Sequence, residues 1–192
     1  MINTIRQLFE KKIHNFKESI EKISYDKEND QSLCHWKDSF YNFDRITAFL
    51  LKGMNQTASV DMLAFGKKQI VFVEFKAGKN VKKDKKQLQL KILESLLLFE
   101  MIVSNHLNPS SKELKSLEKV YIVVYDPQKI PPSQTRTKYM ENHLDSRQVR
   151  FGVDKYQDTF LSETKTLSCG EEFKKVLRRY GCLIQSNQNY TQ

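Results

Sequence analysis

The pattern of apolar and polar residues predicts a helix at the start of the chain. Between residues 2 and 23, apolar side chains recur at spacings of three and four, and the other positions are mainly charged. Residues 24–32 lose this period and are mostly polar, which predicts a surface loop. Residues 33–43 return to helical spacing and residues 44–51 alternate, so we expect a short helix followed by a strand.

Two short apolar runs in the middle of the chain predict a β-hairpin. They cover residues 59–65 and 69–77, and the three residues between them are Gly66, Lys67 and Lys68. The second run is apolar at both alternating sets of positions. This pattern is typical of a central strand that is covered on both faces.

A long helix and another strand are predicted after the hairpin. The predicted helix covers residues 86–104 and is apolar nearly all round beyond Lys91, so it must pack on several sides. Residues 119–126 are rich in β-branched side chains. Because this run follows a helix that crosses back over the sheet, we expect it to lie parallel to an earlier strand.

The last third of the chain predicts a loop, two strands and a helix. Residues 129–146 contain two prolines and no apolar period, which indicates a long basic loop. Residues 148–156 and 159–167 each have the composition of a strand. Ser168 and Glu171 have the spacing of a capping box, which predicts that a final helix begins there.

These segments together predict a single α/β domain over residues 1–192. Its core, a central mixed β-sheet flanked by helices, covers about residues 44–126, with the helix at 2–23 before it and an extension at 128–192 after it. A chain of this length is sufficient for one hydrophobic core and does not require two.

The charge of the chain favours an anionic partner. Lys and Arg number 32 against 23 Asp and Glu, which gives a formal net charge of +9. A polyanion such as nucleic acid is the natural partner of such a surface, although solubility alone is the alternative explanation.

Cysteine usage and the apolar segments bear on location. The three cysteines, Cys34, Cys169 and Cys182, are scattered and form no CxxC pair, so we expect reduced thiols and a cytoplasmic protein. The N-terminal segment lacks the features of a signal peptide, and the most apolar window is too short to cross a bilayer. We therefore expect no contact with a membrane.

Three charged residues lie inside the apolar runs of the predicted hairpin. Glu74 and Lys76 share one face of their strand, and Asp61 precedes Glu74 by 13 residues, so a tight turn can bring the two carboxylates together. Two close carboxylates repel each other unless a cation offsets their charge, and oxygen ligands suit Mg²⁺ or Mn²⁺. The alternative is an ordinary ion pair between Asp61 and Lys76, with Glu74 facing solvent.

The residues "VD" followed by "VEFK" resemble the PD-(D/E)XK superfamily of restriction-endonuclease-like nucleases. Val60 stands where the motif has proline. The resemblance implies a core in the order helix, three strands, helix and strand. It also implies that Asp61 and Glu74 bind the metal, with the main-chain carbonyl of Phe75 as a further ligand, and that Lys76 assists the chemistry.

Members of this superfamily often add an acid from the first helix and a polar residue from the helix after the motif. Glu10 and Glu21 are the candidates for the acid, and Gln87 and Lys91 are the candidates for the polar residue, with plain solvent exposure as the alternative for all four. A cluster of lysines beside the motif has the charge to contact a phosphate backbone: Lys79, Lys82, Lys83, Lys85 and Lys86.

The sequence therefore predicts a Mg²⁺-dependent (or Mn²⁺-dependent) endonuclease that hydrolyses phosphodiester bonds of DNA, with RNA also open as a substrate. The rival hypothesis is a non-catalytic module that keeps this fold and binds nucleic acid or protein. By analogy with small proteins that must cut two strands, a homodimer is a further expectation.

Overall fold

The computed structural model describes residues 1–52, 58–76, 81–126 and 152–183, with the backbone alone for residues 81–85. The predicted loop at 129–146 lies outside these residues, as do Lys79 and the side chains of Lys82, Lys83 and Lys85.

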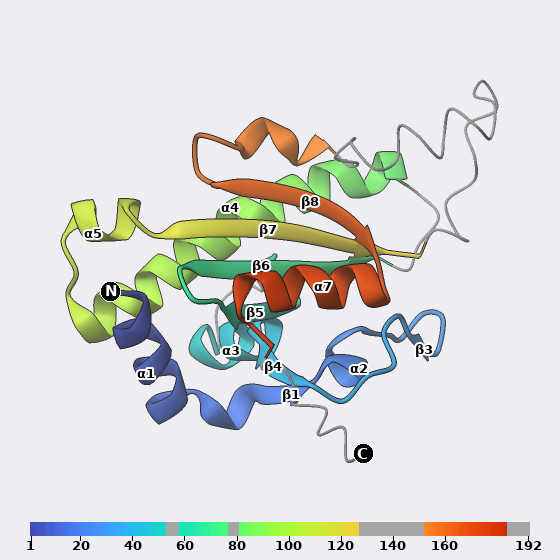
Figure 1. Cartoon of the computed structure of the whole chain (residues 1–192), viewed down its shortest axis with the longest axis horizontal. Coiled ribbons are helices and arrows are strands. Elements are labelled where there is room, and N and C mark those ends of the chain that lie inside the picture. The colour runs from blue at the N-terminus through green and yellow to red at the C-terminus, as the bar shows by residue number, and fades with distance from the viewer. Residues whose placement is uncertain (53–57, 77–80, 127–151, 184–192) are drawn as a thin grey trace, which may run out of the picture.

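The described residues form an α/β structure around a six-stranded mixed sheet (Figure 1). Its strands are β1 (Lys17–Ser19), β4 (Ser39–Asn42), β5 (Met62–Phe65), β6 (Gln69–Lys76), β7 (Glu118–Tyr125) and β8 (Glu163–Ser168), in that spatial order. Neighbours are antiparallel from β1 to β6 and parallel from β6 to β8. A separate small hairpin pairs β2 (Tyr25–Asp26) with β3 (Gln31–Ser32).

Helices lie on both faces of this sheet, with α4 behind it and α7 in front of it in Figure 1. The α-helices are α1 (Ile2–Lys12), α2 (Ile20–Ile23), α3 (Phe43–Leu50), α4 (Val81–Leu107), α5 (Ser111–Lys115) and α7 (Glu171–Tyr180). Short 3₁₀ turns, η1 (His14–Phe16) and η3 (Asp154–Tyr156), complete the described elements. The mixed sheet flanked by helices agrees with the fold class predicted from the sequence.

Alternate residues of β6 supply the two apolar layers of the protein. Phe72 belongs to the cluster that includes Phe9 of α1 and Phe99 of α4. Val73 belongs to the cluster on the other face, with Phe173 of α7. Because successive strand residues point to opposite faces, the unbroken apolar run of β6 from Ile70 to Val73 contributes to both layers.

The hairpin and the parallel strand are confirmed. β5 and β6 pair antiparallel, and β6 pairs with β7 in parallel across the α4 crossover. The helix after the hairpin is longer than predicted, since α4 covers 81–107 rather than 86–104.

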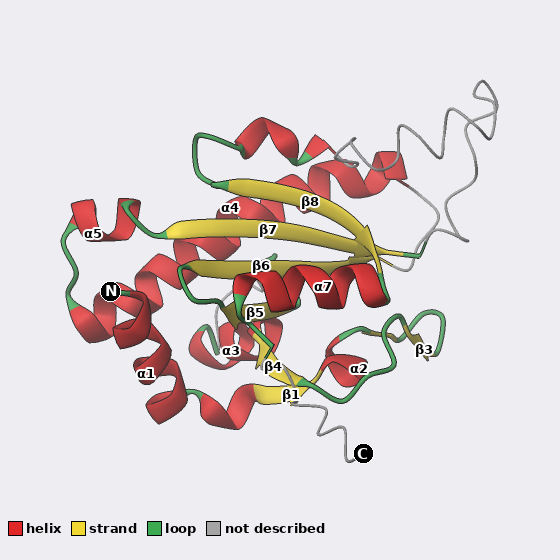
Figure 2. Cartoon of the chain, in the orientation of Figure 1, coloured by secondary structure: helices red, strands yellow, loops and turns green. Residues whose placement is uncertain are grey.

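The prediction for residues 33–51 is wrong in the order of its elements. The expected helix at 33–43 is replaced by extended chain and β4, and the expected strand at 44–51 is α3 (Figure 2). Asn42 caps this helix, because its side chain accepts a hydrogen bond from the backbone N–H of Arg45. Phe43, Ile46 and Thr47 are buried on one helical face. The alternation that suggested a strand involved Ile46, Ala48 and Leu50, and the last two are exposed.

The N-terminal prediction is right only for its first half. The helix ends at Lys12, and the chain then forms β1 along the edge of the sheet before α2 begins. The side chain of Ser19 accepts a hydrogen bond from the N–H of Lys22 and so starts a new helix.

The C-terminal prediction is also partly right. Residues 163–168 form β8, and the predicted final helix is α7, which buries Phe173, Leu177 and Tyr180. Residues 154–156 form a 3₁₀ turn rather than a strand. The capping box between Ser168 and Glu171 is not formed. Gly170 occupies the N-cap with φ of 146°, a conformation that favours glycine, while Ser168 ends β8.

The expected set of reduced thiols is contradicted by a disulfide between Cys34 and Cys169. The two residues lie 135 positions apart, and the fold brings the turn after β8 onto the segment before β4. Cys182 is free. The disulfide removes one of the reasons for expecting a cytoplasmic location, since such bonds are rare in that compartment. Within the described residues, no helix has the length and apolar character needed to cross a membrane.

Candidate active site

The register of the hairpin places Asp61 opposite Glu74. Met62 pairs with Val73, so the next position along each strand brings the two acids together at the open end of the hairpin. The backbone fixes the Asp61 carboxylate, because its Oδ2 accepts a hydrogen bond of 2.6 Å from the N–H of Phe75. Asp61 also accepts a bond at its main-chain carbonyl from the N–H of Phe43, which ties the hairpin to the start of α3.

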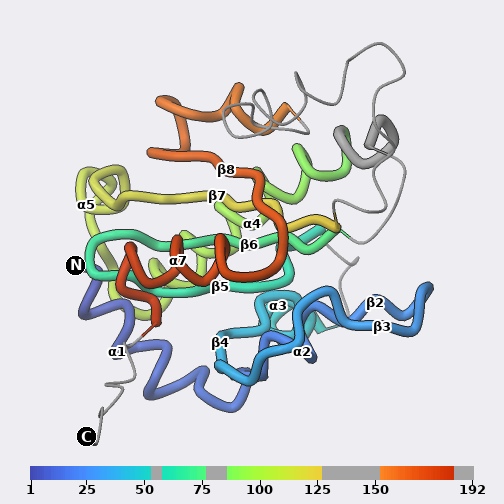
Figure 3. Tube along the Cα trace, turned by 45° about the vertical axis from the view of Figure 1, so that its right-hand side comes forward, coloured from blue at the N-terminus to red at the C-terminus, as the bar shows by residue number. Residues whose placement is uncertain are grey.

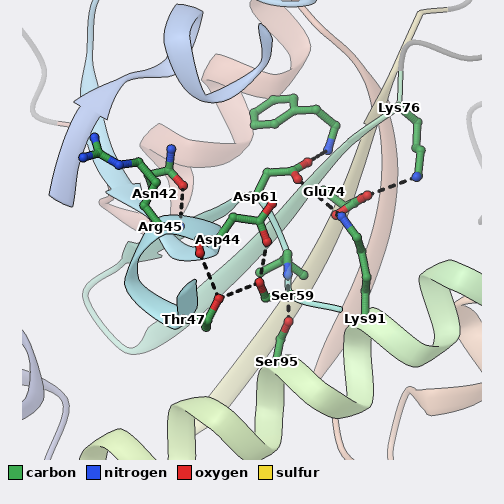
Figure 4. A network of polar contacts seen from close by, with 12 residues as sticks. Asn42, Asp44, Arg45, Thr47, Ser59, Asp61, Glu74, Lys76, Lys91 and Ser95 are labelled. Carbon is green, nitrogen blue, oxygen red and sulfur yellow. Dashed lines mark hydrogen bonds and ion pairs between the residues drawn. The ribbon is translucent and has the colours of Figure 1, made fainter. Parts of the chain in front are cut away.

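Two lysines surround the buried carboxylate of Glu74 (Figure 4). The Lys76 ammonium lies 3.2 Å from Oε1, and the Lys91 ammonium lies 2.9 Å from Oε2. Lys91 reaches Asp61 as well, at 3.4 Å from Oδ1. Lys91 thus joins the two carboxylates, while Lys76 contacts Glu74 from the same strand.

The burial of Glu74 excludes one of the alternatives left by the sequence. Its side chain is 1% exposed, so it does not face solvent, and Lys76 pairs with Glu74 rather than with Asp61. The face of β6 opposite to Glu74 is apolar, where the Phe75 ring packs on Phe173 at 6.2 Å between centroids.

Electrostatics in this cluster are governed by burial. Removal from water raises the pKa of Glu74, and the neighbouring Asp61 raises it further, while Lys91 and Lys76 act in the opposite direction. Burial alone would lower the pKa of Lys91, but Glu74, Asp61 and Asp44 outweigh it and raise that pKa above its usual range. The Lys91 ammonium therefore remains positively charged at neutral pH.

Asp44, on α3, is a third acid beside this cluster that the sequence analysis missed. Its Oδ1 accepts a hydrogen bond from the hydroxyl of Ser59, which lies 2.8 Å from the hydroxyl of Thr47. Asp44 is exposed at the edge of a cavity, but partial removal of its carboxyl from water, followed by the charge of Asp61, raises its pKa. The signal for Asp44 was its position just after a helix-capping Asn42, which was hidden by the expectation of a strand.

Besides supplying Lys91, helix α4 binds the backbone of the segment that precedes the β5–β6 hairpin. The buried hydroxyl of Ser95 accepts a 2.8 Å hydrogen bond from the N–H of Val60. One position earlier along the helix, the Glu94 carboxylate accepts one from the N–H of Ala58. Because Lys91 and Ser95 lie one turn apart, a single face of α4 both anchors residues 58–60 and reaches the carboxylates.

A cavity of about 670 Å³ adjoins Asp44 and Asp61. It lies among α2, α3 and the β2–β3 hairpin, which projects away from the sheet (Figure 3). Four basic side chains line it: Lys22, Lys27, Arg45 and Lys52. The cavity therefore combines cationic walls with two carboxylates, a suitable chemistry for a phosphate-containing ligand near a metal.

Several predicted site residues lie elsewhere. Glu10 pairs with Lys17 at 2.5 Å, and this bond lowers its pKa. The Glu21 carboxylate lies 3.9 Å from Nδ1 of His35. Lys86 and Gln87 are exposed on α4. Of the four accessory candidates, Lys91 alone has a contact with Asp61 or Glu74 in the part of the chain that the structure describes.

The cluster offers two of the ligands that a divalent cation needs, the carboxylates of Asp61 and Glu74. The described residues contain no group of three or more His, Cys, Asp and Glu side chains arranged to hold a metal. Asp61 and Glu74 nevertheless present carboxylate oxygens to one shared cation, the Lys91 ammonium. Oxygen donors of this kind suit Mg²⁺ or Mn²⁺, with the remaining positions open to water and substrate.

No family model, curated protein or solved structure matches the chain. Function is therefore inferred from the residues and their geometry.

Proposed function

We propose that this chain is a nuclease that depends on Mg²⁺ or Mn²⁺ and hydrolyses phosphodiester bonds of DNA, with RNA as the other possible substrate. The observation that carries the proposal is the pairing of Asp61 with buried Glu74 across the hairpin, with Lys76 beside Glu74. Three charged groups held in an apolar sheet are costly for stability, which favours a chemical role.

In this proposal Asp61 and Glu74 hold the metal, together with the main-chain carbonyl of Phe75. The metal would supply Lewis-acid activation of water and would offset negative charge on the phosphate. The N–H of Phe75 orients Asp61, and the contact with Lys91 holds Asp61 and Glu74 near each other. Because Asp61 is already oriented by the backbone, its carboxylate is fixed before the reaction, which favours catalysis.

Lys76 is the residue that we assign to charge stabilisation at the phosphate. Its ammonium lies on the same face of β6 as Glu74 and is 14% exposed, so it is held in place but open on one side. A fixed ammonium beside the metal ligands stabilises charge that develops on phosphate oxygens during hydrolysis.

The order of elements supports assignment to the PD-(D/E)XK superfamily. The elements α1, β4, β5, β6, α4 and β7 follow one another as a helix, three strands, a helix and a strand. In this comparison the segment from η1 to β3, the helix α3 and the short helix α5 count as insertions. In this order, Asp61 falls just before the second strand and Glu74 and Lys76 fall in the third.

A cleavage screen tests the proposal directly. Single-stranded, duplex, flapped and four-way DNA, and RNA, are incubated with purified protein and either Mg²⁺ or Mn²⁺. We expect cleavage that chelation abolishes and that Glu74→Gln or Lys76→Met lowers at least about a hundredfold. Glu172→Gln, at an exposed position on α7, is the matched control. Absence of cleavage of every substrate, or full activity of both variants, would contradict the proposal.

One observation favours the non-catalytic alternative. The chain's own Lys91 and Lys76 already offset the two carboxylates, so the cluster is electrostatically satisfied as a purely structural network. A binding module of this kind predicts nucleic-acid or protein binding without metal dependence. Calorimetry with Mn²⁺ separates the two: a binding signal that Asp61→Asn removes supports the enzyme, and no signal from the wild type supports the module.

A further inference from the structure

Helix α4 exposes a continuous apolar stripe on the side that does not face the sheet. Leu90, Leu93, Leu97 and Met101 are all exposed, and their spacings of three, four and four place them on one face of the helix. Leu97 is 69% exposed. Another part of the chain adds Phe160, which is 58% exposed.

This stripe is separate from the face of α4 that builds the core. Leu88, Ile92 and Phe99 are fully buried in the layer against the sheet. The sequence predicts a helix packed on several sides, whereas the described residues cover only part of its apolar surface. Contiguous exposed leucines on a folded protein indicate an interaction surface.

A hollow of about 770 Å³ adjoins the stripe. Leu93, Leu96 and Leu97 form its α4 side, and Leu117 and Phe160 line it from the segments at 115–119 and 158–162. The surface thus has apolar side chains that protrude next to an apolar hollow, the two features that a self-complementary interface needs.

The charges around this hollow oppose a polyanionic partner. Three acids and two lysines line it: Glu100, Glu118, Asp158, Lys115 and Lys119. Glu100 and Lys119 pair with each other at 3.2 Å. On a chain whose formal net charge is +9, this patch has no positive excess, so it suits another protein surface of mixed charge better than nucleic acid.

We propose that a second copy of this chain packs on this surface, with the two α4 helices antiparallel about a two-fold axis. The spacing is self-complementary in that arrangement. Leu93 would meet the partner's Leu97, and Leu90 would meet the partner's Met101. In residue number the midpoints of these two pairs are 95 and 95.5, so a single two-fold axis near residue 95 can produce both contacts. Each contact then occurs twice, as a two-fold interface requires.

The dimer leaves the candidate active site accessible. Lys91 and Ser95 point from α4 to the hairpin, and the basic cavity lies among α2, α3 and the small hairpin. The interface does not depend on the nuclease proposal. If that proposal is right, the dimer carries two sites, one for each strand of a duplex.

Sedimentation velocity over a range of protein concentrations tests the interface. We expect wild-type particles of twice the 22.7 kDa chain mass. Leu97→Glu and, separately, Phe160→Ser should each raise the dimer dissociation constant at least about tenfold. Phe49→Ser on α3, where the native side chain is 63% exposed, is the matched control and should leave the dimer unchanged.

Circular dichroism shows whether each variant keeps its fold, and Leu90→Glu replaces any variant that does not. A monomeric wild type at all concentrations, or a dimer that persists in both Leu97→Glu and Phe160→Ser, would overturn the proposal.

Cross-linking tests the location of the contact. In a Cys182→Ser background, Leu97→Cys should give a covalent dimer with a short bismaleimide, while Phe49→Cys should not. Equal cross-linking at both positions, or none at Leu97→Cys, would count against an α4 interface even if the protein dimerises.

Discussion

Glu74 is buried across the β5–β6 hairpin from Asp61, and one ammonium, that of Lys91, contacts both carboxylates. The three side chains come from the residue just before β5, from β6 and from a helix that crosses back over the sheet. Each acid is therefore stabilised by a positive charge supplied from elsewhere in the fold. Lys91 supports stability as well as the geometry of the site.

Replacement of Lys91 by methionine tests this dependence. The variant leaves two carboxylates close together with Lys76 as the remaining cation, so we expect the free energy of unfolding to fall by about 3 kcal/mol. Adding Glu74→Gln to Lys91→Met should restore at least about 1 kcal/mol of that loss, because the buried charge is then removed.

Urea denaturation of the two single variants and the double variant measures this coupling. Lys112→Met, an exposed lysine on α5, is the control and should change stability little. Additive losses in the double variant would show that Lys91 and Glu74 do not depend on each other.

The sequence predicted the centre of this fold well because the signals there are local. A glycine turn between two apolar runs defined the hairpin, and the spacing allowed Asp61 to approach Glu74. The register that places them opposite each other was not fixed by the sequence and is given by the structure. Lys91 was one of two residues considered on the following helix, and only the packing of α4 distinguishes it from Gln87.

The missed features depend on contacts between distant segments. Asp44 reaches the site because residues 43–50 form a helix, and that choice depends on the cap at Asn42 and on burial against the hairpin. The Cys34–Cys169 pairing joins residues 135 positions apart, and no local pattern predicts it. Glu18 contacts Arg45 and Asn42 because β1 pairs with β4, a contact that also joins distant segments.

The disulfide should make a large contribution to stability. It closes a loop of 135 residues, so its removal by reductant or by Cys34→Ser should lower the free energy of unfolding by about 3 to 5 kcal/mol. Guanidinium denaturation with and without reductant measures the loss. Cys182→Ser, at the free cysteine, serves as the control.

Thiol counting provides a separate check of the pairing. Alkylation of the denatured protein followed by mass spectrometry should find one reactive thiol before reduction and three after it, since Cys182 is the one free cysteine. Three thiols in protein purified without reductant would contradict the disulfide.

Asp44 should strengthen metal binding without being one of the proposed ligands. Its charge acts on the same region as Asp61, so Asp44→Asn should weaken Mn²⁺ binding about tenfold in calorimetry while the fold is kept. Asp154→Asn, which removes the same charge from an exposed 3₁₀ turn, is the matched control. Equal affinity of the two variants would exclude a role for Asp44.

The basic cavity should bind the strand that carries the scissile phosphate. Lys22→Glu combined with Lys52→Glu reverses two charges on its wall and should weaken binding of a single-stranded oligonucleotide in a fluorescence anisotropy titration without metal. The slope of log affinity against log salt should fall by about 0.7 for each phosphate that the variant protein no longer binds.

The matched control makes the same charge change on another face: Lys11→Glu combined with Lys12→Glu, both exposed at the end of α1. If binding depends only on the net charge of the chain, both double variants will lose affinity equally, and the cavity has no special role. A larger loss for the cavity variant, together with a reduced salt slope, identifies the cavity as the nucleic-acid path. Because this measurement needs no cleavage, it separates strand binding from catalysis. A catalytically inactive protein can still bind the oligonucleotide through the cavity, and an active enzyme can bind it elsewhere.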